Sequence, residues 1–260
     1  MNRFVRPAVL CSLACALFGC ASDFDQSPRR SDYLREQRWA EQVVPGLVVG
    51  ETVPLRTSKP RWEFLAIYTE AKKPRGAVIL VHGMGVHPDY GVIGSLRTRL
   101  ADDGYSTLSI QMPLLAARAP AESYPALFPD AAERIEVALS WLQKKKYRNI
   151  VLLSHSMGTR MANYYLGLHP DAPLTAWVAL SVPTGEFEPG TPGRVPIFDI
   201  YAEKDFPAVL KGASGRAKVL RTAPGSEQAM VYGADHYYNK KEKELASLIE
   251  LMLDDERKRK

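Results

Sequence analysis

Short, mostly apolar runs recur along the chain, and helical stretches separate most of them. A strand that is buried on both faces reads as a continuous apolar run, whereas a half-exposed strand alternates apolar and polar residues. Continuous apolar strands that alternate with helices are typical of a parallel sheet with helices on both faces. The sequence therefore predicts an α/β fold with a mostly parallel central sheet, whose strands include residues 77–81, 105–110, 149–153, 176–180 and 195–200.

The segments between these runs have the spacing of helices. Apolar residues recur every three or four positions in 91–103, 131–145 and the C-terminal stretch 245–253, and 157–168 also has a helical sequence. Two earlier runs are rich in β-branched and aromatic residues and partly alternate, so we expect an antiparallel pair that opens the sheet. These runs are residues 46–55 and 61–70.

The composition fits one globular domain without a nucleic-acid partner. The chain has 260 residues, of which 46% are hydrophobic and 24% are charged, and we expect residues 46–260 to form a single domain. The formal net charge of +5 is too small and too dispersed to indicate nucleic-acid binding. Metal-ligand spacing and a phosphate-binding loop are missing, and Gly83 and Gly85 lack the third glycine of a dinucleotide fingerprint. We therefore expect no metal and no cofactor.

The N-terminus has the layout of an export signal. Its three cysteines are the only ones in the chain, and Cys20 follows a basic start and an apolar run over residues 8–18. That run is too short to span a membrane as a helix. Leu17, Gly19 and Cys20 resemble the bacterial lipoprotein box, which implies a signal peptide over residues 1–19 and lipidation of Cys20.

The lipoprotein resemblance also implies a location. Ala21 in place of an aspartate after the lipidated cysteine favours the outer membrane, facing the periplasm, in a Gram-negative host. Cleavage after Ala16 is the alternative, and it would leave an exported protein without an anchor. Residues 20–45 are interpreted as a tether and an N-terminal flap. We expect a short helix over 31–43 in this segment, with Leu34, the stem of Arg38 and Trp39 against the body.

A serine lies at the junction of a strand and a helix. The strand 150–153 continues into Ser154-His155-Ser156-Met157-Gly158, and the helical sequence begins at once. The turn of a nucleophile elbow needs small residues two positions on either side of its central residue, whose side chain then projects from the sheet. Ser154 and Gly158 are small enough, so Ser156 is the candidate nucleophile.

A serine nucleophile needs a histidine base and a carboxylate that orients the histidine. In folds with this elbow the chain order is serine, acid, histidine. Asp205 follows the strand 195–202, with Glu203 as the alternative acid, and His236 follows the strand 228–232. The other histidines fit local roles: we expect His155 to pack or bond locally and His169 to end a helix.

The stabilisation of a tetrahedral intermediate requires backbone amides aimed at its oxyanion. Val81-His82-Gly83-Met84-Gly85 follows a core strand, and its glycines let the backbone turn toward the site. We assign the oxyanion hole to the amides of Met84 and Met157, the latter at the positive end of a helix. His82 is interpreted as a structural residue that bonds within the loop.

These residues together resemble the α/β-hydrolases, and the resemblance covers Arg61 to Leu253. Residues 82–89, with the pattern HGxGxHPD, are similar to an uncharacterised bacterial family of exported α/β-hydrolase-like proteins. The resemblance implies the fold and a serine-hydrolase apparatus, without an established substrate. His87 and Asp89 either reach the mouth of the site or stiffen their loop, since proline fixes φ and aspartate is a common cap.

The loops predict little or no lid. Residues 183–194 are too few and too rich in glycine and proline for a helical lid, and the longer insertion 113–129 has apolar side chains that either pack on the body or line the entrance. We expect a cell-envelope serine hydrolase that cleaves an ester, a thioester or a similar acyl bond of a small-molecule or lipid-like substrate through an acyl-enzyme. A catalytically silent binding or scaffolding lipoprotein, and a peptidase or amidase with the same triad, are the alternatives. The sequence does not indicate an oligomeric state.

Overall fold

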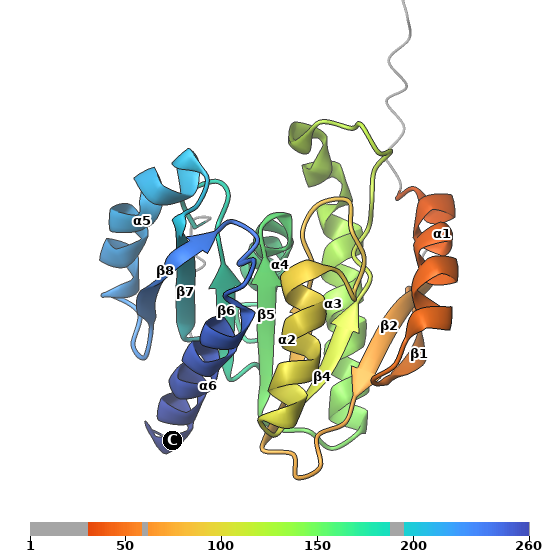
Figure 1. Ribbon diagram of the computed structural model, residues 1–260, viewed down its shortest axis with the longest axis horizontal. Helices are drawn as coiled ribbons and strands as arrows, with labels where there is room; N and C mark the ends of the chain where they lie inside the picture. Colours follow the sequence, from red (N-terminus) through yellow and green to blue (C-terminus); the bar gives the residue numbers. More distant parts are fainter. Residues whose placement is uncertain (1–30, 59–61, 188–194, 260) are drawn as a thin grey trace, which may run out of the picture.

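One sheet of eight strands forms the centre of the protein (Figure 1). The computed structural model describes residues 31–58, 62–187 and 195–259. The strand order is β1-β2-β4-β3-β5-β6-β7-β8; β2 runs antiparallel to both of its neighbours, β1 and β4, and all other neighbouring strands are parallel. The strands are β1 (Glu51–Arg56), β2 (Glu63–Thr69), β3 (Gly76–Val81), β4 (Tyr105–Ile110), β5 (Ile150–His155), β6 (Ala176–Leu180), β7 (Ile197–Lys204) and β8 (Glu227–Asp235).

Helices cover both faces of the sheet. They are α1 (Tyr33–Val43), α2 (Gly91–Asp102), α3 (Phe128–Lys144), α4 (Met157–Leu168), α5 (Pro207–Leu220) and α6 (Glu242–Arg259), with short 3₁₀ helices η1 (Val44–Gly46) and η2 (Ala121–Leu127). Figure 1 shows α2 and α6 in front of the sheet, α3 and α4 behind it, and α1 beside β1 and β2. This arrangement confirms the predicted α/β-hydrolase type of architecture.

Successive residues of the buried strands supply the two faces in turn. Val78 packs into a core with α2 and α6, whereas its neighbour Ile79 packs into a second core with α3 and α4. Because strand side chains alternate between faces, a strand covered on both sides is apolar on both faces and so at most of its positions. The continuous apolar runs of the sequence have this cause.

Several predicted boundaries shift in the structure. The last strand continues to Asp235, so His236 follows it directly. The helix predicted at 131–145 begins at Phe128, because Pro129 occupies its first turn, where a missing amide hydrogen is tolerated. The helix α5 was not predicted from the sequence.

The predicted contact face of the N-terminal helix is confirmed only for Trp39, which is half-buried and packs against the His87 ring. The predictions for the other two residues are wrong, because Leu34 is 68% exposed and Arg38 is also exposed, whereas Glu36 is 3% exposed. The helix packs through polar and aromatic side chains that bond to distant parts of the chain. Its N-cap is Asp32, whose carboxylate accepts a hydrogen bond from the Arg35 amide at 3.0 Å.

The loops on the carboxyl side of the sheet are compact where the structure describes them. Residues 181–187 after β6 form turns without a helix. In the insertion between β4 and α3, the side chains of Leu114, Tyr124 and Leu127 are buried, so they pack on the body. The predicted signal peptide and Cys20 lie outside the described residues. In the part of the chain that is described, none of the helices has the length and apolar character needed to cross a bilayer.

Candidate active site

Three of the predicted site residues come together at the carboxyl edge of the sheet. Ser156 follows β5, Asp205 follows β7 and His236 follows β8. The distance from His236 Nε2 to Ser156 Oγ is 3.0 Å, and that from His236 Nδ1 to Asp205 Oδ1 is 2.6 Å. The carboxylate accepts a hydrogen bond from Nδ1, which leaves Nε2 free to accept the hydroxyl proton of Ser156.

The turn at Ser156 is strained and tightly packed. Ser156 has φ 53° and ψ −123°, a conformation that is costly for a residue with a side chain. A Cβ atom at Gly158 would lie 2.5 Å from the carbonyl oxygen of His82, so only glycine fits there. Ser154, at the position of the first glycine of the usual motif, is buried and accepts a hydrogen bond from Trp177 Nε1 at 2.8 Å.

The carboxylate of Asp205 is surrounded by hydrogen-bond donors. Oδ1 accepts from His236 and from the Phe206 amide at 2.8 Å, while Oδ2 accepts from the Ser181 hydroxyl and from the Ala202 amide at 3.2 Å. Burial alone would raise the pKa of Asp205, but these hydrogen bonds outweigh burial and hold the pKa below its ordinary value. The group is therefore an anion at neutral pH.

Glu203, the alternative acid, lies elsewhere. Its side chain is exposed and accepts a hydrogen bond from the Gly233 amide at 2.9 Å, where it joins β7 to β8. The structure thus brings Asp205, and not Glu203, to His236.

Ser181 and Tyr238 form a second layer that sequence reasoning missed. Ser181 lies directly after β6 with φ 55°, and its hydroxyl is also 3.0 Å from the Tyr238 hydroxyl, which donates to the Ile200 carbonyl. Both residues are completely buried. Because a residue that follows a parallel strand lies at the same edge as the site, the position of Ser181 was the signal that could have indicated it.

His155 forms a hydrogen bond to the main chain of His236. Its Nε2 donates to the main-chain carbonyl of His236 at 2.9 Å, a contact across 81 residues rather than the local bond expected from the sequence. Burial lowers the pKa of His155 to about 4, so the ring is neutral at neutral pH. Two aromatic rings also contact the His236 ring: Phe206 stacks on it with the ring centroids 3.8 Å apart, and Tyr237 packs edge-on against it with the centroids 5.2 Å apart.

The loop after β3 borders the nucleophile. A Cβ atom at Gly83 would lie 3.4 Å from Ser156 Cβ, so the next residue, Met84, begins beside the site, and its side chain is 46% exposed. Met157 is the first residue of α4, whose first amides have no carbonyl partner within the helix. Met157 thus follows Ser156 directly in the chain, and Met84 follows the glycine that packs beside Ser156.

His82 is buried beneath this loop. Its Nδ1 donates to the Gly83 carbonyl at 2.8 Å, and its Nε2 accepts from the Met112 amide at 2.9 Å. Burial lowers the pKa of His82 to about 3, so the ring keeps one proton and this bonding pattern over the neutral range. The contacts agree with the structural role expected for this residue.

His87 and Asp89 brace the loop rather than face Ser156. Asp89 accepts two hydrogen bonds from the buried Arg97, with the shorter N–O distance at 2.7 Å, and its amide donates to His87 Nδ1 at 3.3 Å. The His87 ring packs against Trp39 of α1 at 4.9 Å. The stiffening role is therefore the one that the contacts support.

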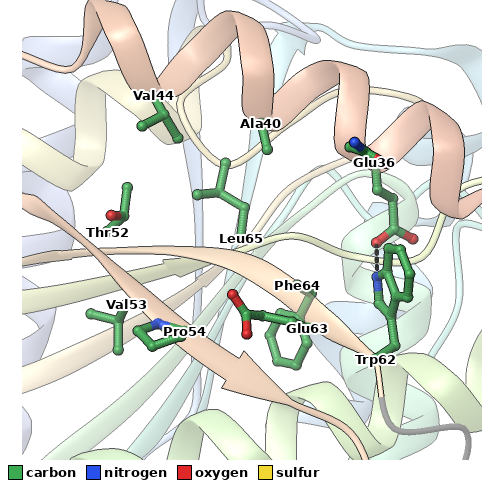
Figure 2. A pocket seen from close by; sticks show the side chains of 11 residues that line it. Glu36, Ala40, Val44, Thr52, Val53, Pro54, Trp62, Glu63, Phe64 and Leu65 are labelled. Atoms are coloured by element: carbon green, nitrogen blue, oxygen red, sulfur yellow. Dashed lines mark hydrogen bonds between the residues drawn. The ribbon is translucent and has the colours of Figure 1, made fainter.

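A cavity of about 510 Å³ lies away from this site, between α1 and the first two strands (Figure 2). Its lining includes none of the three clustered residues. Among the described residues, no group of three or more His, Cys, Asp or Glu side chains is arranged to hold a metal ion.

The fold and the position of this site define the chain as an α/β-hydrolase-fold protein, and comparison with solved structures agrees. A putative α/β-hydrolase from Agrobacterium tumefaciens matches with a TM-score of 0.62 and 19% identity over 78% of this chain and 95% of that one. Est1E from Butyrivibrio proteoclasticus matches with a TM-score of 0.60 and 13% identity over 80% and 99%. A serine hydrolase without a lid from Xanthomonas campestris matches with a TM-score of 0.58 and 10% identity over 80% and 95%.

One family model also matches part of the sequence. Residues 50–133 match the family described as protein of unknown function DUF3530. The matched part includes the loop with Met84 but not Ser156, Asp205 or His236. The search of curated proteins gave no significant match.

Proposed function

We propose that this protein is a serine hydrolase that cleaves an ester, a thioester or a similar acyl bond through an acyl-enzyme intermediate. One observation carries the proposal: Ser156, on a strained turn, lies 3.0 Å from an imidazole that is itself 2.6 Å from a buried carboxylate. The hydrogen bond from His236 to Asp205 fixes the tautomer that can accept a proton from the serine.

The first half-reaction forms the acyl-enzyme. Ser156 Oγ attacks the acyl carbon while its proton moves to His236 Nε2, and Asp205 stabilises the imidazolium that results. The amides of Met84 and Met157 donate to the oxyanion. The C–O or C–S bond then breaks as His236 returns the proton to the leaving group.

The second half-reaction releases the acid. A water molecule gives a proton to His236 Nε2 and attacks the acyl carbon through a second oxyanion, after which Ser156 leaves with that proton. Glu203 takes no part in either step, since its carboxylate bonds to the Gly233 amide.

The substrate class is a small-molecule or lipid-like acyl compound. The side chains of Met84, Phe206 and Tyr237 are 46%, 45% and 53% exposed, and they give the surroundings of Ser156 and His236 an apolar character. Among the similar structures, Est1E has been observed with ferulic acid and an esterase from Thermogutta terrifontis with malate. These ligands support the choice of small acyl substrates for the first assays.

Labelling with a fluorophosphonate probe tests the proposal. The wild type should react at Ser156 and hydrolyse p-nitrophenyl acetate, and Ser156→Ala and His236→Ala should each lose at least ~10³-fold in kcat/KM. Ser247→Ala, an exposed serine on α6, is the matched control and should behave like the wild type. Wild-type turnover equal to that of Ser156→Ala would instead favour a catalytically silent binding or scaffolding protein.

The second part of the proposal is that the protein is an envelope lipoprotein anchored through Cys20, facing the periplasm from the outer membrane. It rests on the sequence of residues 17–20. Several acyl chains, each gaining ~0.8 kcal/mol per buried methylene, would make release from a bilayer negligible. The wild type should therefore partition into detergent with Cys20 as its first residue, whereas Cys20→Ser should keep its leader or be misprocessed. A mature protein that begins at Leu17 and stays in the aqueous phase would contradict the anchor but not the hydrolase.

A further inference from the structure

The N-terminal helix α1 contacts the loop that carries the Met84 amide. Arg35 Nη2 donates to the Gly85 carbonyl at 2.7 Å, and Arg35 Nη1 donates to the Leu115 carbonyl at 2.6 Å. One guanidinium group thus joins three segments: α1, the loop after β3 and the insertion after β4. The part of the chain that matches the DUF3530 family model begins at residue 50, after this helix.

The carbonyl groups on both sides of Met84 are held by hydrogen bonds. The amide of Met84 belongs to the same planar trans peptide as the Gly83 carbonyl, so the two groups point in opposite directions. His82 binds the Gly83 carbonyl at 2.8 Å, and Arg35 binds the Gly85 carbonyl, which is two peptides further along. The orientation of the Met84 amide is therefore controlled from both ends of a three-residue segment.

The hydrogen bond from Arg35 holds Gly85 in a backbone conformation with a positive φ. Gly85 has φ +77°, which glycine adopts freely, and a glycine-rich loop has many alternative conformations to lose on ordering. A Cβ atom at this position would lie 3.2 Å from Arg35 Nη2. The guanidinium thus lies directly against a backbone that would otherwise be free to rotate.

The helix that presents Arg35 is firmly attached. The next residue, Glu36, is buried and forms a two-pronged ion pair with the fully buried Arg134, at 2.9 Å and 3.1 Å. Figure 2 shows the hydrogen bond that Glu36 accepts from Trp62 Nε1, at 3.3 Å. Asp32, at the start of the helix, donates its amide to the Leu114 carbonyl at 2.6 Å. Arg35 is therefore held against the loop by a fixed element.

The same ion pair reaches the other end of the loop. Arg134 Nη1 donates to the Gln111 carbonyl at 3.0 Å, and the next amide, that of Met112, donates to His82 Nε2. Glu36 and Arg35, neighbours on α1, thus connect to the loop by two separate routes. Within the segment interpreted as a flap, α1 is thus bound to the body by polar contacts that the sequence did not indicate.

We propose that Arg35 is a positioning residue of the oxyanion hole: it holds the Gly85 carbonyl so that the Met84 amide points at the developing oxyanion. The inference rests on the proposed hydrolase function. It assigns α1 a part in the catalytic machinery and makes turnover depend on the N-terminal segment as well as on the α/β body.

Kinetics of Arg35 variants test the inference. Arg35→Met should lower kcat about 10- to 100-fold, less than the 10²- to 10³-fold loss of a complete oxyanion donor, because the amide remains but is less well oriented. KM should stay within about twofold, since the contact matters mainly in the transition state. Arg35→Lys, which can reach one of the two carbonyls, should recover part of kcat. The control is Arg38→Met, an exposed arginine on the same helix, which should match the wild type.

Backbone NMR relaxation separates this inference from the proposed function. In Arg35→Met the amide order parameters of residues 83–86 should fall from about 0.85 toward about 0.6, whereas those of the strands, and those of residues 83–86 in Arg38→Met, should stay at the wild-type values. If an active wild type and Arg35→Met have the same kcat, or if the order parameters of 83–86 do not change, the inference is wrong. If the wild type fails to label at Ser156, the proposed function fails, and the order-parameter comparison still decides whether Arg35 holds the loop.

Discussion

Replacing Asp205 with asparagine tests the arrangement of the site most directly. The carboxylate accepts hydrogen bonds from four donors: the His236 ring, the amides of Phe206 and Ala202, and the Ser181 hydroxyl. An asparagine side chain has one acceptor oxygen and one NH₂ group, so the NH₂ group must face one of the two donor pairs. Each orientation predicts a different loss of activity.

In one orientation the NH₂ group faces His236. The ring must then carry its proton on Nε2, which can no longer accept the proton of Ser156, and a wrong tautomer costs about 10⁴-fold in kcat. In the other orientation the NH₂ group faces Ser181, whose hydroxyl can turn and accept. The tautomer is then preserved, but the charge 2.6 Å from the imidazolium is lost.

The second orientation sets the lower limit of the effect. A hydrogen bond to a charged group contributes about 1.5 to 3 kcal/mol, which corresponds to a factor of about 10 to 100 at 1.4 kcal/mol per tenfold change. We therefore expect Asp205→Asn to lower kcat by about 10- to 10⁴-fold, measured as initial rates of p-nitrophenyl acetate hydrolysis. Circular dichroism and urea unfolding should show that the variant remains folded.

Glu203→Gln is the matched control. The Glu203 carboxylate is exposed and accepts a hydrogen bond from the Gly233 amide, so the kcat of Glu203→Gln should equal that of the wild type. If Asp205→Asn retains kcat within threefold and Glu203→Gln is the damaging change, the assignment of the acid is wrong.

Two further predictions concern stability. Gly158→Ala should lower the free energy of unfolding by more than about 2 kcal/mol, because its Cβ atom would lie 2.5 Å from the His82 carbonyl oxygen. In Gly167→Ala, on the same helix, the Cβ atom would meet nothing within 4 Å, so the free energy of unfolding should rise by up to about 1 kcal/mol. Equal effects of the two substitutions in urea unfolding would contradict the packing argument. Burial lowers the pKa of His155 from 6.5 to about 4, so between these pH values the ring takes up a proton in the unfolded state but not in the folded state. The free energy of unfolding therefore falls by about 3 kcal/mol as the pH decreases from 6.5 to 4. His155→Gln should therefore show a smaller decrease in unfolding free energy between pH 7 and pH 4.5 than the wild type, and an equal decrease would contradict the lowered pKa of His155.

The architecture and the candidate site could both be inferred from the sequence. Continuous apolar runs indicated strands covered on both faces, and the small residues around Ser156 indicated the turn between a strand and a helix. The carboxyl ends of parallel strands meet at one edge, so residues that follow three different strands could be expected to lie together. Ser156, Asp205 and His236 were inferred in this way, and the structure places them within hydrogen-bonding distance.

The surroundings of the site were decided by tertiary structure. The role of α1 depends on the contact of Arg35 with Gly85, across 50 residues, and on the pairing of Glu36 with Arg134, across 98. Periodicity favoured Leu34 as the packing residue, but Leu34 is exposed. Burial of a polar side chain is unfavourable unless a partner compensates for the lost water, and the partner is fixed only when distant segments meet. The repeating apolar pattern is local and can be read along the chain, whereas the pairing of buried polar groups is a property of the folded protein alone.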